Sequence, residues 1–188
     1  MDKLVIDIET KNTFADVGGE HNLKNLDMSV VGVYSYNQDK YLCFDEHQTK
    51  ELGELFQKAG LIIGFSINRF DIPVLEKYFS FNLAAIPKLD LLEEIELSLG
   101  RRVSLDILAK TNLGGLGKTH HSLEAITLYR DGNMEELKNY CLNDVKLTKE
   151  LYDLAHRRKF LVVPDRNTGE LATARFAWQD VALPATLF

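Results

Sequence analysis

The sequence KLVIDIET at residues 3–10 begins with an apolar run and ends with two carboxylates. Residues 3–8 are rich in Leu, Val and Ile and alternate little, a pattern typical of a strand that is covered on both faces. We therefore predict a central strand there. Because side chains alternate across a strand, Asp7 and Glu9 are expected on the same face at its end.

The segments that follow predict an antiparallel pair of strands and then a helix. Residues 30–36 and 40–44 are β-branched and aromatic runs separated by polar residues, which favours a hairpin. Residues 46–59 carry apolar side chains at helical spacing, and Gly60 is the expected C-terminal stop of that helix. Residues 61–65 then predict another strand.

The second half of the chain is predicted to be mostly helical, with the longest helix after Asn133. Asn133 and Glu136 form a capping-box-like start, and apolar side chains continue at helical period to Tyr152. Strands followed by alternating strands and helices predict a mixed α/β layer architecture. Shorter helices are expected over residues 72–79, 91–99 and 105–110.

From Phe160 the pattern changes to short apolar runs around a turn signal at residues 167–169. A terminal hairpin or a loosely packed arm is expected, with residues 172–178 as its second half. We therefore predict one domain over residues 1–160 and a C-terminal hairpin or arm over residues 161–188.

Length and composition favour a globular chain. With 188 residues, 45% of them apolar, the chain can bury a core in one domain. Its apolar runs are far shorter than the roughly 20 residues needed to cross a bilayer. Its start lacks the features of a secretory signal, so we expect a cytoplasmic protein. Cys43 and Cys141 lack paired Cys/His spacing and are expected to be reduced thiols.

The formal net charge of −6 argues against a nucleic-acid protein when it is taken alone, because phosphates are neutralised by Lys and Arg. A site that gathers carboxylates around divalent cations also adds negative formal charge, however, and the bound metals reverse its local sign. The net charge therefore excludes neither class.

Two positions besides Asp7 and Glu9 carry candidate functional side chains. Asp71 follows a predicted strand, where a strand-end crevice is expected, but taken alone it fits a helix cap slightly better. Tyr140 and Asp144 are four residues apart on the longest helix and project from one face. Taken alone, core packing and a surface partner explain that pair better, and a solvated strand end explains Asp7 and Glu9.

Three stretches taken together resemble, in order, the three motifs of the DEDD exonucleases: VIDIET (5–10), GFSINRFDIPVL (64–75) and YCLNDVKLT (140–148). The resemblance covers about residues 3–160. It is nearest to the exonuclease domains of family B DNA polymerases and to stand-alone or helicase-associated relatives. It implies a ribonuclease-H-like α/β fold, a mixed sheet flanked by helices. Tyr140 lies four residues before Asp144, which implies the tyrosine subclass, DEDDy.

The resemblance further implies a 3′-5′ exonuclease that hydrolyses phosphodiester bonds at the 3′ end of single-stranded nucleic acid, with DNA favoured over RNA. Asp7, Glu9 and Asp144 would hold the Mg²⁺ or Mn²⁺ ion that activates water, and Asp7 and Asp71 would hold a second ion. A tyrosine, with an unperturbed pKa of about 10, would orient that water rather than act as a strong base. A helicase or polymerase partner is expected.

Substrate contacts are expected from residues beside these motifs and from one loop lysine. Ser66 and Arg69 stand where the family usually carries Asn. For the loop of residues 114–118, a solvated surface loop is the better explanation when it is taken alone. The expected contacts are Thr10, Ser66, Asn68, Arg69 and Lys118.

Other motifs fail on spacing. LGKT at residues 116–119 matches the end of a P-loop, but Asn112 stands where that motif needs its first glycine. His120 and His121 are adjacent, and adjacent residues seldom converge on one metal ion. Asp90 and Asp106 are expected to cap helices. A catalytically silent binding or adaptor module with the same fold and an endonuclease stay open as alternatives.

Overall fold

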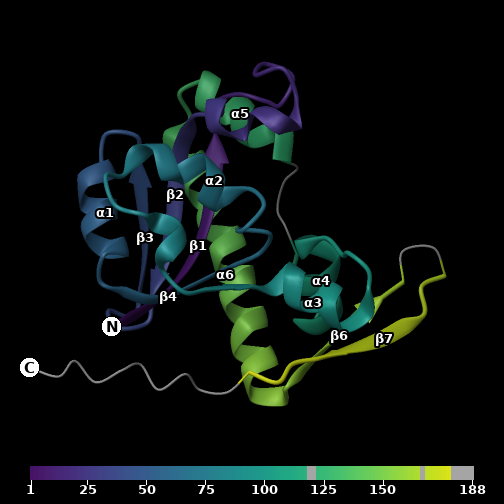
Figure 1. Ribbon diagram of the computed structural model, residues 1–188. Helices are drawn as coiled ribbons and strands as arrows, with labels where there is room; N and C mark the ends of the chain where they lie inside the picture. Colours follow the sequence, from purple (N-terminus) through teal and green to yellow (C-terminus); the bar gives the residue numbers. More distant parts are fainter. Residues whose placement is uncertain (118–121, 166–167, 179–188) are drawn as a thin grey trace, which may run out of the picture.

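The computed structural model describes residues 1–117, 122–165 and 168–178, and its main feature is a five-stranded mixed sheet with strand order β3-β2-β1-β4-β5 (Figure 1). β1 pairs antiparallel with β2 and parallel with β4, so the predicted central strand is confirmed. β2 and β3 form the predicted antiparallel pair. The strands are β1 (Asp2–Thr10), β2 (Met28–Ser35), β3 (Lys40–Asp45), β4 (Ala59–Gly64) and β5 (Lys88–Asp90).

Six α-helices accompany the sheet in the described part of the chain. The longest is α6, which contacts β1, β2 and β3, and it matches the helix predicted after Asn133. Short 3-10 turns cover Glu20–Asn25, Glu76–Tyr78 and Leu83–Ala85. The α-helices are α1 (Thr49–Phe56), α2 (Asp71–Leu75), α3 (Leu91–Leu99), α4 (Leu105–Asn112), α5 (Ser122–Arg130) and α6 (Met134–Arg158).

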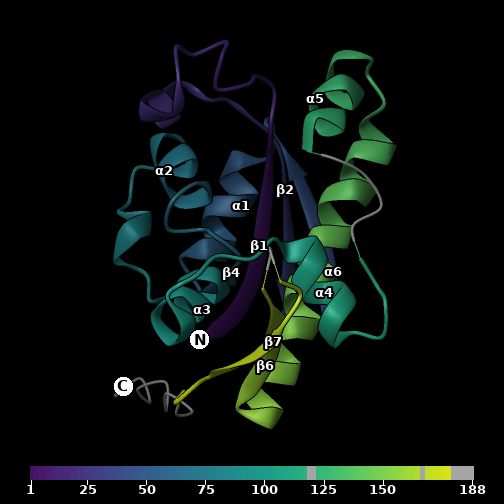
Figure 2. The ribbon, with the colours of Figure 1, turned by 90° about the vertical axis from the view of Figure 1, so that its right-hand side faces the viewer.

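The alternation of side chains along β1 assigns its residues to two apolar layers. Leu4 and Ile6 are fully buried in the layer that contains α1 and α2. Val5 is buried in the other layer, together with Val145 of α6. Figure 2 shows α1 and α2 on one side of the sheet and α6 on the other. Asp7, two residues after Val5, therefore faces α6.

Three local predictions are wrong in detail. The helix predicted over residues 46–59 ends at Phe56, and Gly60 lies inside β4 rather than at a helix stop. Asn133 does begin α6, but its side chain makes no capping hydrogen bond. Asp106 lies within the first turn of α4, whose cap is Ser104. For α4 another residue, Ser104, makes the capping hydrogen bond, and for Gly60 the pairing of β4 with β1 overrides the local signal.

The chain ends, in its described part, with a two-stranded antiparallel hairpin of β6 (Phe160–Pro164) and β7 (Leu171–Arg175). Its buried side chains Leu161 and Ala174 belong to the same apolar cluster as Val5 of the central strand. The side-chain amide of Asn112 donates to the Val162 carbonyl at 2.7 Å and accepts from the Val162 N–H at 2.9 Å. The hairpin is thus packed on α4, while the division of the chain at residue 160 stays a prediction.

Candidate metal centre

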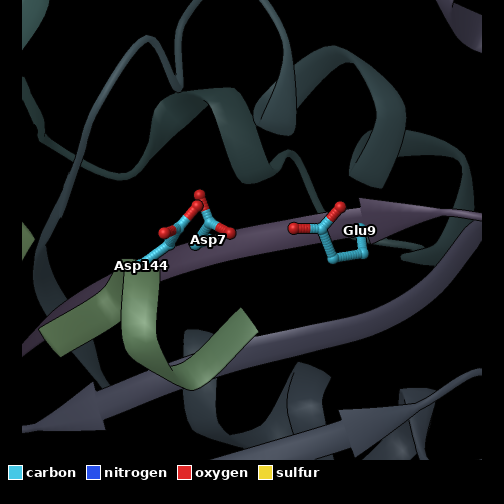
Figure 3. Close-up of side chains that lie close together, drawn as sticks. All are labelled: Asp7, Glu9 and Asp144. Atoms are coloured by element: carbon cyan, nitrogen blue, oxygen red, sulfur yellow. The ribbon is translucent and has the colours of Figure 1, made fainter. Parts of the chain in front are cut away.

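Three carboxylates come together between β1 and α6. Each of Asp7, Glu9 and Asp144 offers an oxygen atom, and these three oxygens lie within 4.8 Å of one another. Asp144 is buried, whereas Asp7 and Glu9 are half-buried. Figure 3 shows the carboxylates of Asp7 and Asp144 side by side, with Glu9 further along β1. The strand pairing shifts register between Glu9 and Thr10, so the site stands where the regular ladder ends.

A glycine on the neighbouring strand lets α6 approach this part of the sheet. Gly32 is the cross-strand partner of Asp7. A β-carbon at Gly32 would lie 2.8 Å from Val145 Cγ2 and 3.0 Å from Cys141 Sγ. These are residues of the α6 turns that flank Asp144. The absence of a side chain at Gly32 therefore sets the close distance at which Asp144 meets Asp7.

The donor set fits a hard divalent cation. Carboxylate oxygens are the ligands that Mg²⁺ prefers, and Mn²⁺ accepts them equally. Three ionised carboxylates this close repel one another, so each disfavours ionisation of the others until a cation compensates the charge. A bound ion would thus stabilise the arrangement that the fold imposes on Asp7, Glu9 and Asp144.

Asp71 lies at the same edge of the sheet but outside this three-carboxylate group. It is the first residue of α2 and is 4% exposed. The cap residue of α2 is Phe70, so Asp71 is not the helix cap that was an alternative for it. Because β4 runs parallel to β1, with Val5 opposite Ile63, the chain leaves β4 towards Asp71 at the end where Asp7 and Glu9 stand. The structure brings three of the four predicted acidic residues together and places the fourth, Asp71, at the start of α2, the helix that follows β4.

Tyr140 is buried on α6, one turn before Asp144. Its ring lies in an apolar cluster with Val30 of β2, Leu128 of α5 and Leu137 of α6. The core-packing interpretation of its ring is therefore correct. It does not exclude a role for the hydroxyl group.

A family model for the RNase_H superfamily matches residues 4–156, which is most of the chain and includes every motif described above. The chain belongs to the RNase_H superfamily. The predicted ribonuclease-H-like α/β fold is thereby confirmed.

Among solved structures, this RNase_H-superfamily chain is similar to a family B DNA polymerase from the hyperthermophilic archaeon Pyrobaculum calidifontis. The TM-score is 0.63 at 16% sequence identity, and the match covers 83% of this chain. It covers 24% of the polymerase chain, so the similarity concerns one part of a larger protein. At this identity the match establishes a shared fold. Comparison with curated proteins found no match.

Three of the side chains predicted to contact substrate make hydrogen bonds or ion pairs within this RNase_H-superfamily fold: Thr10, Asn68 and Arg69. Thr10 Oγ1 donates to the Asn12 carbonyl at 2.9 Å. Asn68 Nδ2 donates to Glu93 Oε2 at 2.7 Å, and Arg69 pairs with Glu96 at 2.6 Å. Asn68 and Arg69 thus bind acidic side chains of α3. Ser66 adopts a left-handed backbone, with φ of 67°. Lys118, His120 and His121 lie outside the described residues.

Sequence reasoning missed two residues that shape the site, Gly32 and Cys141. An isolated glycine within a β-branched run does signal a close backbone approach, so Gly32 was detectable. Cys141 carried no such signal. Its Sγ lies 3.4 Å from the Asp7 carbonyl oxygen and 3.8 Å from Asp7 Oδ2, so the thiol is positioned to donate a weak hydrogen bond to either.

Both thiols are expected to resist alkylation in the native protein. Burial raises the pKa of Cys141 well above its usual range, and the charges of Asp7 and Glu9 raise it further. Burial also raises the pKa of Cys43 to about 11. Because the thiolate is the reactive form, a raised pKa leaves less of it at neutral pH. Mass spectrometry after iodoacetamide treatment should find both thiols unmodified in folded protein and modified in denaturant. Rapid native modification of Cys141 would contradict this assignment.

Proposed function

We propose that the chain is a metal-dependent 3′-5′ exonuclease of the tyrosine subclass, which hydrolyses phosphodiester bonds at the 3′ end of single-stranded nucleic acid, DNA in preference to RNA. The observation that carries the proposal is the convergence of Asp7, Glu9 and Asp144 between β1 and α6. The RNase_H-superfamily match supports a nuclease, because it spans residues 4–156 and so includes the elements that supply these residues. The similarity to a polymerase over 83% of the chain is compatible with this.

In this proposal the acidic residues divide between two cations, Mg²⁺ or Mn²⁺. Asp7, Glu9 and Asp144 would hold the first, and Asp7 and Asp71 would hold the second. When bound, such a pair acidifies water and stabilises the negative charge on the attacking and leaving oxygens. The burial of Asp144 and Asp71 keeps their carboxylates fixed and shielded from bulk water. Each residue thus contributes a preformed ligand position rather than a proton transfer.

Tyr140 is proposed to orient the attacking water through its hydroxyl group. Its ring is held by the apolar cluster of α5, α6 and β2, which restricts the directions that the hydroxyl can take. No histidine stands five residues before Asp144, where Asn139 is found. The water therefore depends on the cation for its acidity and on Tyr140 for its direction.

Replacing Tyr140 by phenylalanine should reduce kcat about tenfold, which corresponds to one net hydrogen bond of about 1–1.5 kcal/mol in the transition state. The ring packing is retained, so the variant should still fold cooperatively. Steady-state hydrolysis and thermal melting of the two proteins check this. Unchanged kcat in Tyr140→Phe would remove the hydroxyl group from the mechanism.

The direct test uses a single-stranded oligonucleotide labelled at its 5′ end, in matched DNA and RNA versions, with Mg²⁺, Mn²⁺ or EDTA. The proposal predicts products that shorten by one nucleotide at a time from the 3′ end, with either metal and not in EDTA. Internal fragments would indicate an endonuclease. An intact oligonucleotide under every condition would indicate a catalytically silent binding or adaptor module.

The wider setting of the activity is part of the same proposal. We propose a helicase or polymerase partner for this protein and a place in DNA repair. The similarity to one part of a polymerase, 24% of that chain, is compatible with a polymerase partner. No helix in the described residues is long and apolar enough to cross a membrane. A cytoplasmic location is a separate part of the proposal.

A further inference from the structure

A buried carboxylate at the end of β5 makes more hydrogen bonds than a helix cap requires. Asp90 is 3% exposed, and its Oδ1 accepts the Leu92 and Glu93 N–H groups at 3.0 and 3.3 Å, which caps α3. The same Oδ1 accepts the Ser66 N–H at 2.8 Å, and Oδ2 accepts the Asn68 N–H at 3.1 Å. The expected cap is confirmed, and Asp90 also binds a turn more than twenty residues away.

That turn is tight and under backbone strain. Ser66 has φ of 67°, which L-residues rarely adopt. A β-carbon at Gly64 would lie 2.0 Å from Ile67 Cγ2, so the turn folds back on the end of β4. Strained backbone of this kind persists when its surroundings hold it in place. Here the N–H groups of Ser66 and Asn68 both donate to the Asp90 carboxylate, which stabilises the strained turn.

The turn is hydrogen-bonded directly to the start of α2, where Asp71 stands. The Ile72 N–H donates to the Ile67 carbonyl at 2.9 Å, and the Phe70 N–H donates to the Ser66 carbonyl at 3.2 Å. Asp71 lies between these two anchored residues. The position of its carboxylate therefore follows from the conformation of the turn.

We propose that Asp90 is a positioning residue for the second cation: by fixing the turn of residues 66–68, it holds Asp71 where that carboxylate and Asp7 can share an ion. The inference rests on the proposed function, since it assumes a two-cation site. Asp90 itself binds no cation in this account, because its oxygens are occupied by four backbone donors.

The change Asp90→Asn separates the two roles of this side chain. The amide keeps an oxygen for Leu92, Glu93 and Ser66, so the cap of α3 is retained. It places an NH₂ group against the N–H of Asn68, which breaks the bond made by Oδ2. A second variant, Asp90→Ser, keeps a capping side chain but is too short to reach the turn.

Ser104→Ala is the matched control. Ser104 caps α4 by accepting the Ile107 N–H at 3.3 Å, and no contact found for it in the described structure involves the turn. Loss of the α4 cap lowers the stability of the fold without removing a hydrogen bond to the turn. A purely structural role for Asp90 would make its variants resemble Ser104→Ala.

The test is Mn²⁺ binding to the full chain, with deoxythymidine monophosphate present to complete the site, measured by electron paramagnetic resonance of free Mn²⁺. Wild type should bind two ions. Asp90→Asn and Asp90→Ser should lower the affinity for the second ion about 10–100-fold, as changes to residues that orient metal ligands do. They should leave the first ion unchanged, and Ser104→Ala should bind both ions as wild type does.

Other outcomes overturn the inference in distinguishable ways. Wild-type binding of both ions by either folded Asp90 variant would show that the turn does not position Asp71. An equal loss of affinity for both ions would indicate that the variants loosen the whole fold rather than displace Asp71. Wild-type protein that binds fewer than two ions would refute the proposed two-cation function itself, and the role of Asp90 with it.

Discussion

Replacing Asp144 by asparagine is expected to abolish hydrolysis and, in metal-free protein, to raise the melting temperature. Asp144 is buried, and one of its oxygens lies within 4.8 Å of an oxygen of Asp7 and an oxygen of Glu9, so the three could ligate one ion. Loss of one ligand weakens the binding of a cation that would stabilise the transition state by several kcal/mol. The rate should therefore fall about 1000-fold or more. Removing one of three repelling charges should stabilise the metal-free fold by about 0.5–2 kcal/mol.

The opposite signs of these two effects distinguish a metal ligand from a structural residue. Glu135→Gln is the matched control, because Glu135 also carries a carboxylate on α6 but is exposed in its first turn. For that variant, the hydrolysis rate with metal and the melting temperature in EDTA should both be near the wild-type values. An active Asp144→Asn protein would remove Asp144 from the mechanism. An inactive one that melts well below wild type in EDTA would point to a structural role.

Replacing Gly32 by alanine is expected to cause the second largest loss. The new β-carbon would lie 2.8 Å from Val145 Cγ2 and 3.0 Å from Cys141 Sγ, so α6 must move away from β2. Overpacking of this kind costs about 1–3 kcal/mol of stability. Because Asp144 moves with α6, a shift of about 1 Å from Asp7 should lower kcat about 100-fold. Chemical denaturation and steady-state kinetics measure the two losses.

A second substitution tests the steric cause. Val145→Ala removes the methyl group that the new β-carbon meets, so Gly32→Ala combined with Val145→Ala should recover much of the lost kcat. The double-mutant cycle should therefore be strongly non-additive. Additive losses would mean that Gly32 does not set the distance between α6 and the sheet. Wild-type kcat in Gly32→Ala alone would lead to the same conclusion.

The sequence predicted those elements whose patterns are long and regular. β1 was predictable because Leu4, Val5 and Ile6 precede Asp7 and Ile8 follows it. α6 was predictable because its apolar side chains repeat at helical period over many turns. The bounds of α1 were less predictable. Glycine is common after helices, yet the pairing of β4 with β1 places Gly60 in a strand. Tertiary pairing overrode a local signal there.

The residues of the candidate site were predictable from the sequence, but the distances between them were not. The spacing of Asp7 and Glu9 fixes a shared face, but only packing against Gly32 determines how closely Asp144 approaches. The hydrogen bond from the Ser66 N–H to Asp90 joins residues that are 24 positions apart in the sequence, and no local pattern predicts such a contact. For the same reason, the spacing of Asn68 and Arg69 gave no sign that α3 engages both side chains.

The central claim is that Asp7, Glu9 and Asp144 form a binding site for a divalent cation. The most direct measurement is an anomalous difference map from crystals of the protein grown with Mn²⁺. We predict a strong peak among the oxygens of these three side chains, which lie within 4.8 Å of one another. Well-diffracting crystals with no Mn²⁺ peak at these carboxylates, or with peaks only elsewhere on the protein, would contradict the account.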